Sequence, residues 1–243
     1  MNRVVKNGLF ACALAALAVQ PALAQDEVKD YPGAPDPTSY GYTVLALGIG
    51  TPFALPWGFD WDVFGLDLNL AYGDCNKMYG LEIAGIANTA RLNMIGLQAS
   101  IGCNFANRDA VGAQIALVNI GNRTTYGLSL DAIAVRRDFI GLSGDALIGA
   151  YDSEIYGLEI AGLGSAVRED MWGWQLAAGA NFARRLHGLQ TAVLFNMTEE
   201  LRGAQLALVN YASTCSAGFQ IGLLNFIMDN QVPVLPIFNC YFG

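Results

Sequence analysis

Three stretches decide the fold: residues 112–119 read GAQIALVN, residues 203–210 read GAQLALVN, and residues 218–225 read GFQIGLLN. Each stretch begins with a glycine, alternates between polar or small residues and apolar ones, and ends with an asparagine. An alternation with a period of two is typical of a β-strand. The same pattern recurs, less strictly kept, along most of the chain, which therefore consists of tandem repeats.

The repeat is marked by glycines that follow one another at intervals of 14 to 16 residues. The residues one and three positions after the glycine are apolar in most copies, whereas the second is Asp, Glu, Gln or Ser in every copy. Each strand thus has an apolar face and a polar-to-small face, and we interpret the polar column as an exposed strip. The eleven glycines are Gly65, Gly80, Gly96, Gly112, Gly127, Gly141, Gly157, Gly173, Gly188, Gly203 and Gly218.

Two all-β architectures fit this pattern. In a β-solenoid each repeat is one coil, and equivalent residues stack about 4.8 Å apart, which explains the columns of like residues. In an outer-membrane β-barrel each repeat would be one antiparallel strand, and short turns would alternate with longer loops. Because the connections are uniform, we predict a β-solenoid of about eleven coils of 15–16 residues with capping strands. The antiparallel outer-membrane barrel is the alternative.

The sequence predicts five parts. Residues 1–24 are typical of a signal peptide, with Arg3 and Lys6 before an apolar run and a cleavage site after Ala24. Residues 25–39 are rich in Pro and Asp and are expected to be flexible. Residues 40–62 are expected to cap the N-terminal end, residues 63–226 to form the repeat array, and residues 227–243 to cap the C-terminal end. The signal peptide predicts export to the surface, outer membrane or periplasm of a bacterium.

Charge and composition exclude several classes of function. The chain has 243 residues, 13 of them Lys or Arg and 21 Asp or Glu, for a net charge of -8. No basic stripe is present, which argues against a nucleic-acid partner. The single histidine argues against a His-ligated metal site or a His-based catalytic triad. We therefore predict no cofactor, no metal and no enzymatic activity.

The repeat also resembles a known type. Residues 63–73 (VFGLDLNLAYG), 79–83 (YGLEI) and 220–226 (QIGLLNF) are similar to the units of exported bacterial surface-repeat proteins, which are built from tandem G-L-Q-I-G-L-V-N motifs. The resemblance covers residues 63–242 and is weakest in the middle copies, where serine replaces glutamine. It implies an exported, surface-associated protein, and it transfers no catalytic residues.

Three sets of residues are candidate sites. Asp131 and Asp145 each lie four residues after a repeat glycine in neighbouring copies, so a solenoid would stack them about 5 Å apart. Such a pair suggests a weak Ca²⁺ site or an acid pair, with a hydrolase as the remote alternative. The exposed polar strip, represented by Gln175, Gln190 and Gln205, is predicted to bind an extended ligand.

The cysteines complete the set of candidates. Four remain after export, and an even number in an exported protein suggests disulfides. Cys215 and Cys240 are expected to staple the C-terminal cap, with free thiols as the alternative. The predicted function is that of a non-catalytic envelope or surface protein with a structural or adhesive role. Its expected partner is a glycan or a protein at the cell surface, and membrane association belongs to the barrel alternative.

Overall fold

The computed structural model describes residues 41–50, 53–56 and 61–242. The chain divides into two units, Met1–Thr38 and Ser39–Gly243, and every described residue belongs to the second. The predicted signal peptide (1–24) and flexible segment (25–39) lie outside the described residues. The same is true of parts of the predicted capping segment (40–62).

The described residues form fifteen β-strands that belong to one continuous, wound sheet. The longest, β9, passes through more than one coil without a break. The strands are β1 (Gly41–Gly50), β2 (Phe53–Leu55), β3 (Trp61–Cys75), β4 (Lys77–Ala84), β5 (Ala87–Ala90), β6 (Met94–Ser100), β7 (Cys103–Ala106), β8 (Ala110–Ile115), β9 (Val118–Tyr151), β10 (Ile155–Ala161), β11 (Gly164–Ala177), β12 (Ala180–Ala192), β13 (Phe195–Leu206), β14 (Val209–Ile227) and β15 (Val234–Phe242).

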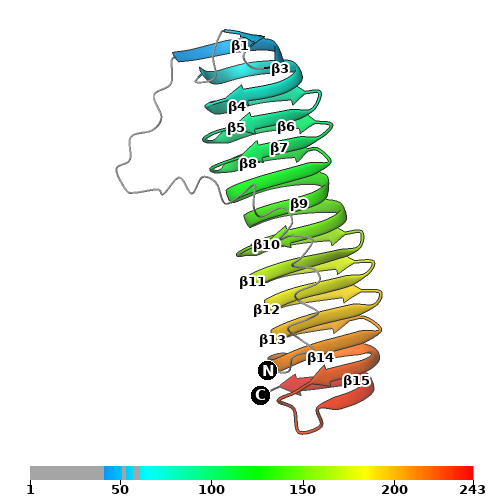
Figure 1. Cartoon of the computed structure of the whole chain (residues 1–243). Coiled ribbons are helices and arrows are strands. Elements are labelled where there is room, and N and C mark those ends of the chain that lie inside the picture. Colours follow the sequence, from blue (N-terminus) through cyan, green and yellow to red (C-terminus); the bar gives the residue numbers. More distant parts are fainter. Residues whose placement is uncertain (1–40, 51–52, 57–60, 243) are drawn as a thin grey trace. The chain divides into compact units, whose positions relative to one another are not determined.

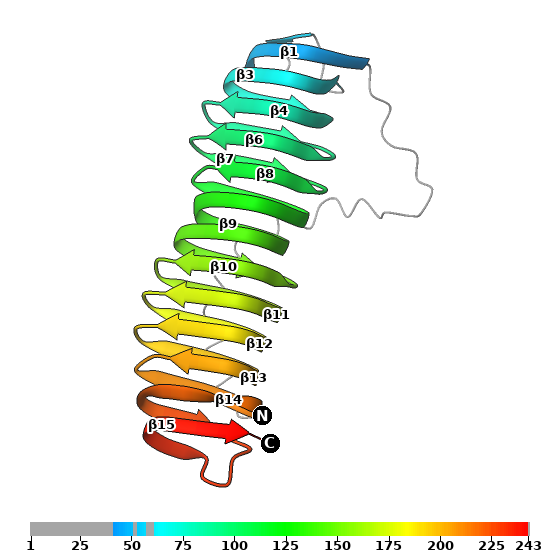
Figure 2. The same ribbon diagram turned by 180° about the vertical axis from the view of Figure 1, so that it is seen from behind.

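The strands are the turns of a β-solenoid of about eleven stacked coils, which confirms the predicted fold and excludes the barrel (Figures 1 and 2). Pairings between consecutive coils are parallel and in register. Gly157 of β10, for example, pairs with Gly141 of β9 on one side and with Gly173 of β11 on the other. A barrel built from the same repeats would need antiparallel neighbours.

Capping strands close both ends of the stack. At the N-terminal end β1 pairs in parallel with β3, and β2 folds back antiparallel onto β1. At the C-terminal end β15 runs antiparallel to β14, so the parallel winding stops there. Such reversals blunt the open sheet edges, which otherwise recruit strands from other chains.

The glycine column exists because consecutive coils approach too closely for a side chain at this position. Gly157 has a φ of 142°, which is a backbone conformation that favours glycine. A Cβ placed on Gly157 would lie 2.0 Å from the carbonyl oxygen of Gly141 in the preceding coil. The same contact recurs from coil to coil, which explains why the residue is kept throughout the array.

The faces of the coil are reversed relative to our interpretation of the sequence: the polar column points inward. Gln190, Gln205 and Gln220 are fully buried, and each donates from its Nε2 to the Oε1 of the glutamine one coil earlier, at 2.7–2.8 Å. A second ladder joins Asn196 to Asn210 at 3.0 Å and Asn210 to Asn225 at 2.9 Å. In-register stacking lets each buried amide bond to its own copy, which removes the usual penalty of burying it.

The rest of the coil interior is apolar and falls into two clusters. The first cluster runs from Ala46 to Ala110, and the second from Ala134 to Ile227. Their members come from the column two residues before each glycine and from the returning strand opposite, such as Met171 and Val167. Buried ionisable groups also lie in the interior, namely Asp67, Glu82, Asp131, Arg136, Asp145 and Glu159.

Candidate functional site

The three predicted glutamines do not form a binding strip. Gln175, Gln190 and Gln205 are each 0% exposed and belong to the interior ladder. The prediction of an exposed polar strip is therefore wrong. A period of two shows that a strand has two different faces, but not which of them points into the coil. The polar face can point inward here because its side chains hydrogen-bond to one another.

The structure brings Asp131 and Asp145 together, as the repeat spacing predicts, but it buries them. Asp131 is 8% exposed and Asp145 only 1%. Both belong to β9 and lie in the interior of the coil. A ligand on the outer surface therefore reaches neither carboxylate.

These two carboxylates belong to a buried polar centre made of Asp131, Arg136, Ser143, Asp145 and Tyr151. The Arg136 Nη2 donates to the Asp131 Oδ2 at 2.8 Å, and both side chains are fully buried. The Asp145 carboxylate accepts from the Ser143 hydroxyl at 2.7 Å and from the Tyr151 hydroxyl at 3.0 Å. The guanidinium carbon of Arg136 also lies 6.0 Å from the centre of the Tyr151 ring. The fully buried Glu159 of β10 also contacts Asp145, so Arg136 is set against three carboxyl groups.

The residues around Arg136 explain why the centre forms in this part of the array. Arg136 looks like part of a charged turn, yet its carbonyl accepts from the amide of Asp152, which sets Arg136 beside Tyr151 in the register. The column that carries glutamine elsewhere holds Ser129 and Ser143 here. Their short side chains make room for the guanidinium, because the Nη1 of Arg136 donates to Ser143 at 3.2 Å and its Nη2 donates to Ser129.

The polar centre makes the stability of the fold depend on pH. Burial, and next the neighbouring Asp131, raise the pKa of Asp145 from 3.8 to about 6. The folded state therefore binds a proton more tightly than the unfolded state does. Stability from this group is fully present below pH ~4 and is lost as the pH rises to ~7. We expect the free energy of unfolding to fall on the order of 2 kcal/mol more for the wild type than for Asp145→Asn over this interval.

Urea denaturation at a series of pH values measures this difference. Asp145→Asn keeps the size of the side chain but cannot titrate, so the comparison measures the contribution of Asp145 together with its effect on the neighbouring Glu159. Parallel stability curves for the two proteins between pH 4 and 7 would show that Asp145 keeps its ordinary pKa in the folded state.

The cysteines do not form the predicted staple in this structure. Cys215 and Cys240 are both free thiols, as are Cys75 and Cys103. Cys215 is buried in the second apolar cluster, on β14. Cys240 lies on the antiparallel β15, where it pairs with Phe219 and not with Cys215. The alternative of free thiols is the one that the structure shows.

The apolar columns of the repeat lie on the outer surface of the solenoid. We name this surface the apolar face and define it by its exposed large side chains, which lie one residue before, one after or three after the repeat glycine. Ile160 is 47% exposed and Trp174 43%. The members are Phe64, Ile83, Ile95, Val111, Ile115, Tyr126, Leu128, Leu130, Ile140, Leu142, Tyr156, Ile160, Trp172, Trp174 and Ile221.

Aromatic rings stack along this face from coil to coil. The Phe64 and Tyr79 rings are parallel, with centroids 4.6 Å apart. Farther along, the Trp172 ring lies 6.0 Å from Tyr156 and 3.9 Å from the imidazole of His187, again nearly parallel to both. The single histidine is thus a packing residue in an aromatic row. These contacts hold the face flat and rigid.

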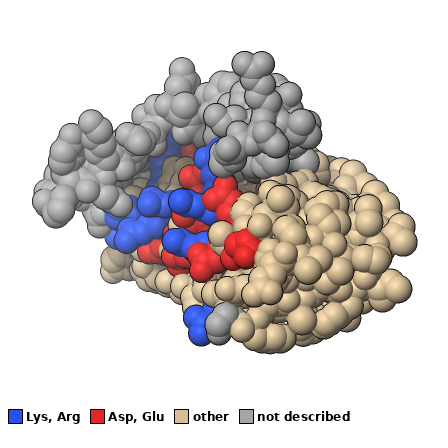
Figure 3. All heavy atoms as spheres, turned by 90° about the horizontal axis from the view of Figure 1, so that it is seen from below, with Lys and Arg blue, Asp and Glu red and all other residues tan. Residues whose placement is uncertain are grey.

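Charged residues gather in a different place, at the turns where one coil passes to the next (Figure 3). We name these turns the charged edge. Ion pairs join its neighbouring coils: Arg91 with Asp74 at 2.7 Å, and Arg184 with Glu169 at 2.9 Å. Arg168 with Asp152 and Arg185 with Asp170 continue the series. The solenoid thus presents an apolar face and, separate from it, an edge of paired charges.

Comparisons with protein-family models, with curated proteins and with solved structures find no match. Among residues 41–50, 53–56 and 61–242, no helix has the length and hydropathy needed to cross a membrane. The geometry of the solenoid therefore carries the functional argument.

Proposed function

We propose that this chain is a non-catalytic structural protein of the bacterial envelope, exported by its N-terminal signal, which assembles by packing its apolar face against the apolar face of a second copy. The observation that carries the proposal is the apolar face itself. Its fifteen exposed large side chains lie in register over the length of the array. Contiguous apolar patches of more than a few hundred Å² are rare on monomeric soluble proteins and mark interaction surfaces.

The size of the apolar face fits a stable dimer. Eleven coils at about 4.8 Å give a length of roughly 50 Å, and five residues across at about 3.3 Å give a width of roughly 16 Å. The product is about 800 Å² for each copy, which is the area that a standard specific interface buries per partner. Two sheets of this shape pack face to face about 10 Å apart.

The distribution of charge supports a protein partner over a lipid surface. The net charge of -8 opposes binding to anionic lipid headgroups. The columns of the apolar face are neutral except for Arg202, which precedes Gly203, and the ion pairs of the charged edge remain in water when two faces meet. A second copy of the chain has the same spacing between its side-chain rows. The rows of one face can therefore pack into the grooves of the other.

The burial of the predicted sites bears on the other functions considered. A glycan was expected on the glutamine strip, and Gln175, Gln190 and Gln205 are inside the coil. A hydrolase was expected to use Asp131 and Asp145, and Arg136 and Tyr151 occupy the space around them. An assembly role needs neither set of residues and uses only the outer surface.

A charge-insertion experiment tests the assembly. We expect the wild type to sediment as a dimer at about 10 µM, and the double variant Leu142→Lys/Ile160→Lys to be monomeric, with a dissociation constant raised at least ~100-fold. Leu142 and Ile160 lie on the apolar face, where the introduced lysines would face the lysines of the partner copy. Analytical ultracentrifugation over a concentration series measures the effect.

The matched control is Leu147→Lys/Leu163→Lys. These two leucines are 44% and 60% exposed and lie in the same two coils, Leu147 farther along β9 and Leu163 between β10 and β11, outside the columns that define the apolar face. This variant is expected to remain a dimer. A monomeric wild type, or a control variant that dissociates as readily as the test variant, would overturn the proposal. Flotation of a monomeric wild type with lipid vesicles would point to a membrane surface instead.

A further inference from the structure

The N-terminal end of the coil interior holds three metal-ligating groups whose positions no ladder explains. A carboxylate oxygen of Asp67, the Sγ of Cys75 and a carboxylate oxygen of Glu82 all lie within 4.8 Å of one another. All three side chains are buried, at 3%, 1% and 0% exposure. Asp67 and Glu82 face each other in the register of β3 and β4, and Cys75 comes from the end of β3.

A break in the asparagine ladder points to a missing ligand at this place. Where asparagines follow one another, each Oδ1 accepts from the asparagine one coil earlier, but Gly73 precedes Asn88 in this column, as Ser165 precedes Asn181. Consequently the Oδ1 of Asn88, which is fully buried, has no hydrogen-bond partner among the described residues. The Oε1 of Glu82 also has no hydrogen-bond partner among the described residues, although its Oε2 accepts from Gln98 at 2.9 Å.

These two unpartnered acceptors are directed at the same space. A Cβ placed on Gly73 would lie 2.8 Å from the Asn69 Nδ2, 3.0 Å from the Glu82 Oε1 and 3.1 Å from the Asn88 Oδ1. Buried oxygens that accept nothing are rare and call for a ligand. Because the two unpartnered oxygens are acceptors and the Cys75 Sγ lies within 4.8 Å of a Glu82 oxygen, a cation complements this group.

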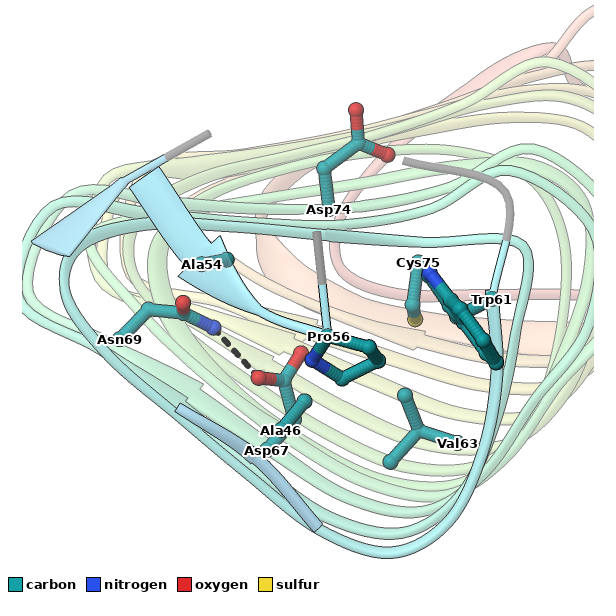
Figure 4. A pocket seen from close by; sticks show the side chains of 9 residues that line it. All are labelled: Ala46, Ala54, Pro56, Trp61, Val63, Asp67, Asn69, Asp74 and Cys75. Carbon is teal, nitrogen blue, oxygen red and sulfur yellow. Dashed lines mark hydrogen bonds between the residues drawn. The ribbon is translucent and has the colours of Figure 1, made fainter. Parts of the chain in front are cut away.

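A cavity of about 20 Å³ adjoins the group and is lined by Asp67, Asn69 and Cys75 together with residues of the cap (Figure 4). This volume is enough for one water-sized guest. Figure 4 shows the Asp67 and Cys75 side chains directed into the coil, whereas Asp74 points out of it. The cavity lies under β2 and Pro56, at the end of the stack.

We propose that Asp67, Cys75 and Glu82 bind a thiophilic divalent transition-metal ion of the Zn²⁺ class. One thiolate and two carboxylates are ligands that zinc accepts, at about 2.3 Å for sulfur and about 2.0–2.2 Å for oxygen. The present separations need to contract by about 1 Å or less around such an ion. Mg²⁺ and Ca²⁺ prefer sites made only of oxygen, and the thiolate selects against them.

The three ligands come from two coils, Asp67 and Cys75 from β3 and Glu82 from β4. An ion held by them ties the first coil to the second, just before the glutamine ladder begins with the bond from Gln98 to Glu82.

The repeat itself supplies the test variants. In the column of Cys75 the next coils have Ala90 and Ala106, and in the column of Glu82 they have Gln98 and Gln114. Cys75→Ala and Glu82→Gln therefore copy side chains that the coil already accommodates. The matched control is Cys103→Ala, which removes a thiol of this half of the array that lies outside the group.

The experiment measures binding of Zn²⁺ to the purified, reduced protein by competition with a chromophoric chelator, and of Co²⁺ by its thiolate charge-transfer absorption. We expect one ion per chain, a thiolate band with Co²⁺, and a rise in melting temperature with Zn²⁺. Cys75→Ala abolishes the band, and both variants weaken Zn²⁺ binding at least ~100-fold, while Cys103→Ala behaves as the wild type.

Three results would overturn the proposal. The first is a wild type that binds less than one ion per chain. The second is a Co²⁺ band that survives Cys75→Ala but is lost in Cys103→Ala, which would place the ion on another thiol. The third is Mg²⁺ or Ca²⁺ displacing Zn²⁺ at equal concentration. Melting curves without metal show whether each variant is folded, so a loss of binding is not confused with a loss of structure.

Discussion

We expect Gly141→Ala to destabilise the solenoid by more than about 3 kcal/mol. Gly141 has a φ of 143°, and a Cβ at this position would lie 2.0 Å from the carbonyl oxygen of Gly127. The contact is with backbone of the preceding coil, so it can be relieved only by separating the two coils or by changing the backbone of β9. Both responses break parallel hydrogen bonds in the middle of the array. Urea denaturation followed by far-ultraviolet circular dichroism measures the loss.

Gly144→Ala is the control for this prediction. Gly144 lies three residues later in the same strand, its φ is outside the left-handed region, and the nearest atom to an added Cβ is the Leu130 Cδ2 at 3.1 Å. Leu130 is exposed and its end can turn away. We expect this variant to stay within about 1 kcal/mol of the wild type. Equal effects at the two glycines would show that the close approach of the coils is not the reason for the column.

The second large effect is expected at the polar centre, where Arg136→Met should destabilise the protein by about 3–5 kcal/mol. Methionine matches the length of the arginine stem, so most of the packing against Phe139 and Tyr151 is kept. What is lost is the cation bonded to Asp131 at 2.8 Å, and two carboxylates then face each other in a dry interior. The measurement is the free energy of unfolding at pH 7.

The triple variant Arg136→Met/Asp131→Ala/Asp145→Ala separates the missing charge from the missing volume. Alanine is what the same inward column holds in later coils, at Ala161, Ala177 and Ala192. We expect the triple variant to recover most of the stability that Arg136→Met loses, because it also removes two of the buried carboxyl groups that the guanidinium compensated and leaves only Glu159 of the three. A triple variant less stable than Arg136→Met would mean that the loss comes from packing.

Much of the fold could be predicted from the sequence, because the repeat is so regular. The glycine period of 14–16 residues, the uniform connections and the columns of like residues together select a parallel stack. The asparagine ladder was also predictable, since stacked amides bond to each other. The direction of the faces was not. Leu128 and Gln175 alternate with their neighbours in the same way, and only the stacked amide bonds of Gln175 explain why it is the buried one.

The candidate sites were harder to predict, because their residues meet across the coil and not along a column. Asp131 and Asp145 were found from their spacing, but Arg136 was not joined to them, because that coil is shortened and the turn is displaced. Cys75 and Glu82 lie seven residues apart on different coils, and no linear motif relates them. Their proximity arises only when the coil returns on itself. The columns of equivalent residues predict which side chains are neighbours along the stack. Contacts between opposite sides of one coil can be predicted only when the path of the coil is known.

The regular register also has a consequence for how such a chain can change its length. Gly173, Gly188, Gly203 and Gly218 are separated by 15 residues each, and the ladders that leave one coil fit the next. A gene that gained or lost one such unit would encode a protein in which the amide ladders of the neighbouring coils still bond to each other. No new contact between coils would be needed. The coils around Arg136 lack this freedom, since their charges are matched only to each other. Growth and shrinkage by recombination are therefore confined to the uniform part of the array.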